Sequence, residues 1–168
     1  MDEFGINLTM TRSHARAPRG ERAYVTEPFH HGSNISVIGA LGVHGVCAPM
    51  IIEGAINSEV FELYVQHLLV PSLRPGNLVL LDNVKFHYSP RAMEWIKAAG
   101  ARVVHLPAYS PDLNPIEGCI SKLKIALRSF KARTQRTLTT ALAKALRLIT
   151  KDDIRGWFEH AGYVFSLK

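Results

Sequence analysis

Hydrophobic and polar positions in the first third of the chain alternate with the two-residue period of β-strands. Short apolar stretches bounded by turn-forming residues predict strands at 2–9, 23–26, 35–43 and 46–53, of which 23–26 has the weakest pattern. Gly42, His44 and Gly45 suit the turn between the last two stretches. The pattern therefore predicts an antiparallel meander of strands.

From residue 57 onward the pattern changes to the three- and four-residue spacing of an amphipathic helix. Asn57 or Ser58 is suited to cap this helix, which we expect to end before Pro71. The following apolar run, LVLL at 78–81, is continuous rather than alternating, as in a parallel strand that is buried on both faces. Asp82 then lies at the carboxyl end of a buried strand.

The same order of helix and strand is repeated in the next segment. Ser89 and Pro90 predict the start of a helix that ends at Gly100, and a further strand is predicted at 102–106. Three helices follow, at about 114–130, 138–149 and 152–160, and the last two form a C-terminal part from about residue 137. A meander followed by crossover units and terminal helices predicts one α/β domain, over residues 1–168, with a mixed sheet.

Length and composition agree with a single folded domain. Of the 168 residues, 47% are hydrophobic and 20% are charged, which is typical of globular proteins and unlike disordered chains. The net charge of +6 and the sequence pI of about 9.5 favour a polyanionic partner, with nucleic acid as the leading candidate.

Basic residues are concentrated in two parts of the chain. Nine lysines and arginines and no acid lie between Gly118 and Lys151, which favours a phosphate-contacting face, with a solvated helix surface as the alternative. A second cluster, of arginines, follows the first predicted strand. The candidate DNA-binding residues are Arg12, Arg16, Arg19, Lys122, Lys124, Arg128, Lys131 and Arg133.

The two cysteines and the apolar stretches argue against several other classes of protein. Cys47 and Cys119 have neither the spacing of metal ligands nor a partner pattern for a disulfide framework. No stretch approaches the roughly 18 apolar residues of a membrane span, and the N-terminus lacks the features of a signal peptide. We therefore expect a soluble, intracellular protein, which in a bacterium would be cytoplasmic and associated with the nucleoid.

Three acidic residues lie where a metal site for phosphodiester chemistry would need them. Asp2 lies in the first strand, Asp82 follows the buried strand, and Glu117 lies in the first turn of a helix. Such chemistry needs divalent cations at the attacking and leaving oxygens, and carboxylates on rigid elements are suitable ligands. The alternatives are a solvated terminal charge for Asp2 and turn chemistry for Asp82 and Asn83. For Glu117 the alternative is a capping box with Asn114.

Three sequence blocks resemble the catalytic blocks of mariner-related DDE transposases, in particular those of bacterial insertion sequences. In order along the chain, the blocks are MDEFGINL, LVLLDNVKFH and LPAYSPDLNPIE. The third is the most specific, because YSPDLNPIE matches the block of the family residue for residue. Glu117 follows Asp82 by 35 residues, which is similar to the short spacing of the family. The segment MTRSHARAPRGER resembles the basic segment that follows the first strand in the family.

The resemblance implies a ribonuclease-H-like fold with a mixed five-stranded sheet flanked by helices. The implied catalytic residues and metal ligands are Asp2, Asp82 and Glu117. They are expected to hold two Mg²⁺ ions, which Mn²⁺ can replace. The polar residues expected to line the cleft are Asn83, His87 and Asn114, although an isolated His87 would more often be a surface residue. The implied partners are double-stranded DNA, at element ends and target, and a second copy of the complete protein.

The chain departs from the family pattern in two respects. Ile120 stands where family members usually have a tryptophan, three residues after the glutamate. We expect a packing change there rather than lost chemistry, because Ile120 belongs to an apolar helical stripe formed by Ile116, Ile120, Leu123, Leu127 and Phe130. Asp2 follows Met1 directly, so half of the first strand and the N-terminal helix-turn-helix region of the family are expected to be absent. We therefore expect weak DNA binding with little sequence preference.

The sequence predicts a metal-dependent transposase that cuts DNA strands at the ends of an element and transfers them to a target. One face of the third-block helix supports this prediction, because its members follow helical spacing and combine an acid with basic residues: Glu117, Ser121, Lys124 and Arg128. Two other functions stay open. They are a non-catalytic DNA-binding remnant or regulator, and a ribonuclease-H-like nuclease without transfer activity.

Overall fold

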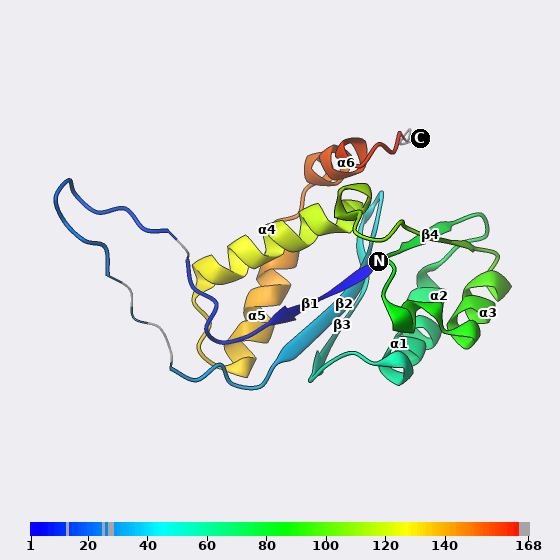
Figure 1. Cartoon of the computed structure of the whole chain (residues 1–168), viewed down its shortest axis with the longest axis horizontal. Helices are drawn as coiled ribbons and strands as arrows, with labels where there is room; N and C mark the ends of the chain where they lie inside the picture. Colours follow the sequence, from blue (N-terminus) through cyan, green and yellow to red (C-terminus); the bar gives the residue numbers. More distant parts are fainter. Residues whose placement is uncertain (13, 25, 27–28, 165–168) are drawn as a thin grey trace.

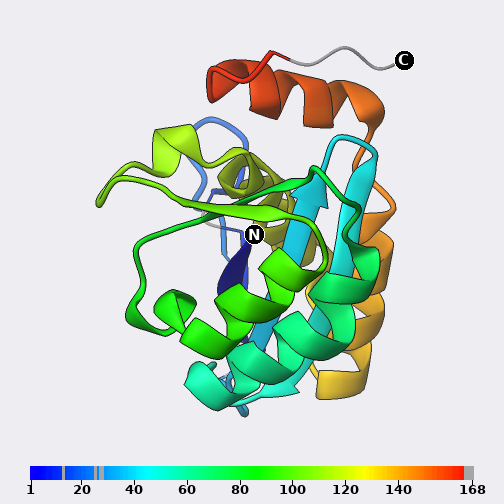
Figure 2. The same cartoon turned by 90° about the vertical axis from the view of Figure 1, so that its right-hand side faces the viewer.

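Helices cover both faces of a small central sheet in the computed structural model (Figure 1, Figure 2). The structure describes residues 1–12, 14–24, 26 and 29–164. The strands are β1 (Asp2–Ile6), β2 (Ile35–Gly42), β3 (Gly45–Glu53), β4 (Leu78–Leu81) and β5 (Arg102–His105). The helices are α1 (Ser58–Tyr64), α2 (Val70–Ser72), α3 (Pro90–Ala98), α4 (Pro115–Phe130), α5 (Gln135–Leu146) and α6 (Lys151–His160). Shorter helical segments are the π-helical η1 (Val65–Leu69) and the 3₁₀ turns η2 (Lys85–Tyr88) and η3 (Pro111–Leu113).

The predicted meander is confirmed for β1, β2 and β3. β2 lies between the other two strands and pairs antiparallel with both. Gly42 and Gly45 are paired at the end of the β2–β3 hairpin, and Gly45 has a positive φ of 146°, which a glycine adopts without strain. The turn predicted from the glycines is therefore present at the expected place.

The prediction of a strand at 23–26 is wrong for its described residues, and Val25 lies outside the described part of the chain. Residues 23, 24 and 26 form no strand and belong to an arm, made of the described residues between 7 and 34, that projects from the body (Figure 1). The side chain of Tyr24 in this arm is 86% exposed. A short run with no apolar surface to cover gains too little from pairing to form an independent strand.

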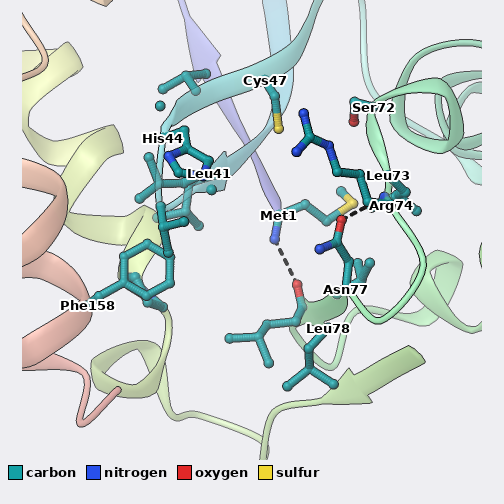
Figure 3. Close-up of a pocket in the computed structure, with 18 of the residues that line it drawn as sticks. Met1, Leu41, His44, Cys47, Ser72, Leu73, Arg74, Asn77, Leu78 and Phe158 are labelled. Atoms are coloured by element: carbon teal, nitrogen blue, oxygen red, sulfur yellow. Dashed lines mark hydrogen bonds between the residues drawn. The ribbon is translucent and has the colours of Figure 1, made fainter. Parts of the chain in front are cut away.

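The prediction of one five-stranded sheet is wrong, because the strands form two sheets. β4 and β5 pair in parallel with each other and are separate from the meander. The two sheets meet where the amino group of Met1 donates a hydrogen bond of 2.7 Å to the carbonyl of Leu80 (Figure 3). Met1 also packs with Val79 and Leu81 of β4 in one hydrophobic cluster.

Successive side chains of the meander face two separate hydrophobic cores, as the alternation of a strand requires. The residues that pack with α4 and α5 are Phe4, Ile6, Ile35 and Val37. On the opposite face, Met1 and Ile38 pack with residues of α1, η1, α3 and β4. The same alternation turns Asp2 toward α4 and Glu3 toward η2.

The first long helix continues past the position where we expected it to end. It starts as predicted, with Oδ1 of Asn57 accepting a hydrogen bond of 2.9 Å from the backbone N–H of Val60. The backbone then widens into η1, where the N–H of Val70 bonds to the carbonyl of Val65, and α2 includes Pro71. This wider spacing accommodates a proline, which has no N–H to donate. The predicted end before Pro71 is therefore wrong.

The three C-terminal helices confirm the predicted order with shifted bounds. α4 buries the predicted apolar stripe, including Ile120, except for Phe130, which is 40% exposed at the end of the helix. α5 starts at residue 135 rather than 138, because Thr134 and Thr137 form a capping box upstream of the first apolar residue. In the described part of the chain, no helix combines the length and apolarity needed to cross a membrane.

Candidate active site

Three carboxylates that are far apart in the sequence line one open cleft of about 400 Å³. Asp2 comes from β1, Asp82 follows β4, and Glu117 lies in the first turn of α4. The segment 106–111, after β5, forms another wall of the cleft. The structure therefore brings together the three acidic residues that the sequence singles out.

Asp2 is buried, with 7% of its surface exposed, so the alternative of a solvated terminal charge is wrong. Its Oδ1 accepts a hydrogen bond of 2.8 Å from the backbone N–H of Glu3, and its Oδ2 accepts one of 2.9 Å from Nδ2 of Asn114. Burial raises the pKa of Asp2 to about 6. The hydrogen bond from Glu3 opposes this shift, and the charges of Glu3, Glu117 and Asp82 add to it.

Asp82 takes part in the turn after β4 and also faces the cleft. Its Oδ1 accepts hydrogen bonds from the backbone N–H of Val84, at 3.2 Å, and from Nδ1 of His87, at 2.5 Å. The bond from Val84 is the contact expected of an aspartate that stabilises a turn, which was the alternative role for Asp82. No residue that the structure describes donates a hydrogen bond to Oδ2, so this oxygen is available to a ligand in the cleft.

Glu117 does not cap α4, so the alternative of a capping box with Asn114 is wrong. In a capping box its carboxylate would accept the backbone N–H of Asn114, but this N–H donates to the carbonyl of Pro111 at 3.0 Å. The side chain of Asn114 makes no cap hydrogen bond and is directed to Asp2. The Glu117 side chain is exposed and lines the cleft.

The three polar residues expected to line the cleft lie at different depths. Asn83 and Asn114 are part of the lining. His87 lies behind the cleft wall, with 0% of its surface exposed, against the rings of Phe61 and Phe86. His87 is therefore neither a surface residue nor a part of the described cleft lining.

The chemistry of the cleft suits a divalent cation. Its donors are hard carboxylate oxygens, and their mutual repulsion contributes to the raised pKa of Asp2. In the described part of the chain, no three His, Cys, Asp or Glu side chains are already grouped closely enough to hold a metal ion. The carboxylates therefore have to turn toward a bound cation, as Oδ2 of Asp82 and the exposed Glu117 are free to do.

Most of the predicted DNA-binding residues lie along α4 and in the arm. The ammonium of Lys124 lies 5.8 Å from the centroid of the Phe4 ring, and Arg128 follows one helical turn later. The guanidinium of Arg133 donates a hydrogen bond of 3.2 Å to the carbonyl of Leu8, where the arm begins. Four other predicted DNA-binding residues are exposed: Lys131 at the end of α4 and Arg12, Arg16 and Arg19 in the arm.

Lys122 differs from the other basic residues of α4. Its ammonium forms an ion pair with the carboxylate of Asp153 in α6. Helical spacing also turns Lys122 away from the face that carries Glu117 and Lys124. Lys122 therefore contributes to the packing of α6 on α4.

A larger hollow, of about 570 Å³, lies where the two sheets meet (Figure 3). The turn of the β2–β3 hairpin, Met1, Arg74 and Phe158 form parts of its wall. Its described lining contains no aspartate or glutamate. The smaller cleft is therefore the place where metal-assisted chemistry is possible.

Glu3 is a neighbour of the site that the sequence pattern does not reveal. It points away from Asp2, and its Oε2 lies 3.4 Å from Nε2 of His87. The signal that would identify it is a charged residue within a largely buried strand, because such a charge requires a partner.

A mixed α/β fold thus brings three carboxylates into one cleft, as a metal-dependent nuclease requires. The family model of the DDE superfamily endonucleases matches residues 1–139, and the chain belongs to this family. No curated protein sequence matches the chain.

Solved structures of a mariner transposase share the fold. The structure of the mariner Mos1 paired end complex with Mg is similar, with a TM-score of 0.75 at 18% identity, and the match covers 95% of this chain and 52% of that chain. For the Mos1 transposase paired-end complex with left transposon end, the TM-score is 0.73 at 16% identity over 96% of this chain and 51% of that chain. For the Mos1 mariner paired end complex with Mn, the TM-score is 0.72 at 17% identity, and the match covers 96% of this chain and 52% of that chain. The chain thus spans about half the length of these Mos1 chains.

Proposed function

We propose that this chain is the catalytic domain of a transposase, which cuts DNA strands at the ends of a mobile element and joins them to a target. The observation that carries the proposal is the meeting of Asp2, Asp82 and Glu117, from three elements, in one cleft. Membership of the DDE endonuclease family and the fold shared with Mos1 transposase complexes support it. The three sequence blocks favour the bacterial insertion-sequence branch of the family.

In this function the three carboxylates hold divalent cations, with two Mg²⁺ ions expected and Mn²⁺ as a substitute. The cations would stabilise charge on the attacking and leaving oxygens of the phosphodiester. The protein contributes the orientation of the ligands: Asn114 at the start of α4 holds Oδ2 of Asp2, so the helix that carries Glu117 also fixes the carboxylate of β1. Mg and Mn are present in the similar Mos1 complexes.

The DNA substrate would lie along a basic track formed by Lys124, Arg128, Lys131 and Arg133. α4 runs from its first turn, which carries Glu117, toward the base of the arm (Figure 1), where Arg133 bonds to the carbonyl of Leu8. The arm continues the positive charge with Arg12, Arg16 and Arg19. Lysine and arginine at such positions bind DNA phosphates without reading sequence. A homodimer of the complete protein is the assembly we propose for joining two element ends.

The proposal is tested with a labelled duplex that carries element ends, by following nicked and joined products in the presence of Mg²⁺. Asp82→Asn should lower the cleavage rate by more than about 100-fold, because even partners outside the metal shell are worth 10–100-fold. The control is Asp112→Asn, which removes an exposed carboxylate of η3 outside the cleft lining and should leave the rate unchanged.

The products separate the three candidate functions. Cleavage that requires Mg²⁺ and yields joined strands supports the transposase. Cleavage without joined strands favours a ribonuclease-H-like nuclease. DNA binding without any metal-dependent cleavage favours a non-catalytic remnant or regulator and would overturn the proposal.

A further inference from the structure

The buried ring of His87 lies between two partly exposed carboxylates. Its Nδ1 lies 2.5 Å from Oδ1 of Asp82, and its Nε2 lies 3.4 Å from Oε2 of Glu3. The rings of Phe61 and Phe86 pack against the imidazole at centroid distances of 4.8 and 4.7 Å. The three residues, Glu3, His87 and Asp82, form a connected group directly behind the cleft.

Glu3 lies against the side of the His87 ring that faces away from Asp82. Nδ1 donates to the carboxylate of Asp82, while Nε2 and Oε2 of Glu3 are buried and have no other hydrogen-bond partner in the described structure. Burial lowers the pKa of His87, but the two carboxylates outweigh burial and raise it.

The hydrogen bond from His87 determines which oxygen of Asp82 faces the cleft. Oδ1 is occupied by the bonds from His87 and Val84, and Oδ2 is left for a ligand. The terminal torsion of an aspartate is broad and nearly two-fold, so without His87 the two oxygens would exchange more easily. A ligand whose orientation is not fixed binds a metal ion less tightly.

We propose that Glu3 and His87 are positioning residues, which hold Oδ2 of Asp82 toward the cleft for metal binding. The proposal rests on the proposed function, because it takes Asp82 as a metal ligand. Glu3 acts through His87, because its carboxylate lies against Nε2 and holds the ring in place behind the cleft. Neighbouring residues of β1 thus serve two layers of the site, with Asp2 in the cleft and Glu3 behind it.

The first test is Mn²⁺ binding to the full chain without DNA, measured by electron paramagnetic resonance. Glu3→Gln preserves the size of the side chain and removes its charge, and we expect it to weaken Mn²⁺ affinity by about 10-fold or more. Asp112→Asn removes an exposed charge outside the cleft lining and should leave the affinity within about threefold, because solvent and salt screen such a charge. Unchanged affinity in a folded Glu3→Gln variant overturns the proposal.

A double-mutant cycle separates positioning from a simple loss of negative charge. His87→Asn retains a donor near the position of Nδ1 but carries no charge. If Glu3 acts through His87, adding Glu3→Gln to His87→Asn weakens Mn²⁺ binding no further. If the two losses add, Glu3 attracts the cation directly and its positioning role is wrong.

Nuclear magnetic resonance of the histidine N–H protons gives a readout that needs neither metal nor catalysis. The short bond from Nδ1 to Oδ1 of Asp82 should give a downfield proton resonance in the metal-free chain. In Glu3→Gln this resonance should move upfield or disappear while the circular dichroism stays that of the folded protein. An unmoved resonance overturns the proposal, and this result can be obtained even where His87→Asn does not fold.

Asp82→Asn shows which proposal has failed if the results disagree. Full Mn²⁺ affinity in Asp82→Asn overturns the metal site of the proposed function. Loss of affinity in Asp82→Asn together with full affinity in Glu3→Gln overturns the positioning role alone and leaves the proposed function standing.

Discussion

At the scale of single residues, the site uses two side chains that leave β1 in opposite directions. Asp2 meets Asn114 on the α4 side, and Glu3 meets His87 on the other side. The partner of Asp2 comes from the start of α4, and the partner of Glu3 comes from the turn after β4. Each carboxylate therefore depends on a contact between distant parts of the sequence.

Glu117 is a residue whose change should affect activity and leave stability nearly unaltered. It makes no capping box and is exposed, so Glu117→Gln should change the unfolding free energy by less than about 0.5 kcal/mol, as for most surface substitutions. Gln is a poor ligand for Mg²⁺, and cleavage should be lost. Denaturant unfolding and Mg²⁺-dependent nicking measure the two effects. Retained nicking would show that this carboxylate is not a ligand.

Asp2 should contribute more to the stability of the metal-free protein as the pH falls. Its pKa is raised from 3.8 to about 6 in the folded chain, so between these values the folded state binds a proton that the unfolded state releases. The unfolding free energy that Asp2 contributes rises by on the order of 1 kcal/mol between pH 7 and pH 5. The full contribution, on the order of 3 kcal/mol, is reached below pH 4. The raised pKa of His87 acts with the same sign, since its contribution is lost as the pH rises through the folded value.

Denaturant unfolding in the presence of a chelator, at a series of pH values, checks this dependence. Asp2→Asn should be more stable than the unmodified chain at pH 7 and should show a flatter pH profile, since it removes the buried charge. Saturating Mg²⁺ should also flatten the profile, because a bound cation favours the ionised carboxylate. Equal profiles for the two metal-free proteins would contradict the burial of an ionised Asp2.

At the scale of secondary-structure elements, the sequence predicts an element well where one local pattern determines it. The continuous apolar run of β4 and the apolar stripe of α4 are such patterns, and both elements lie where expected. The strands divide into two sheets, which meet at the long-range hydrogen bond from Met1 to Leu80, and no local pattern contains this arrangement. The continuation through Pro71 depends on a backbone widening that leaves no mark in the hydrophobic period.

The same distinction applies to the site. The three carboxylates are predictable because they lie in sequence blocks that resemble a known family. The burial of His87 and the role of Glu3 cannot be predicted from the sequence, because both depend on which face of β1 contacts η2. The ion pair between Lys122 and Asp153 cannot be predicted either, because it joins two helices whose packing is not evident from the sequence.

The contact between α4 and α6 can be tested at a glycine. A Cβ at Gly118 would overlap the indole ring of Trp157, so Gly118→Ala should destabilise the protein by about 1–3 kcal/mol, as overpacking does. Gly156 of α6 faces open space, and Gly156→Ala should stabilise the helix by about 0.5–1 kcal/mol. Denaturant unfolding measures both. If the two variants were equally stable, α6 would not pack on α4 in this way.

At the scale of the whole molecule, an acidic cleft lies within a basic protein. The net charge is +6, and the basic track runs along the helix whose first turn carries Glu117. The carboxylates repel a phosphodiester unless cations neutralise them, whereas the track and the arm attract the flanking phosphates. Binding of DNA and binding of metal should therefore be separable, with the basic track determining the first and the cleft determining the second.

The affinity of the chain for DNA should fall with salt through phosphate contacts of the basic track. Each neutralised phosphate contributes about −0.9 to the slope of log affinity against log salt, so replacing Lys124 and Arg128 together by alanine should reduce the slope by about two. Lys122→Ala is the matched control, because Lys122 lies on the same helix but pairs with Asp153, and it should leave the slope nearly unchanged. Fluorescence anisotropy between 50 and 200 mM salt measures the slopes. Phosphate contacts carry no sequence information, so element-end and scrambled duplexes should compete about equally for these 168 residues. Strong preference for the element end, or an equal loss of slope in the Lys122→Ala control, would show that the protein reads DNA through a surface other than the basic track.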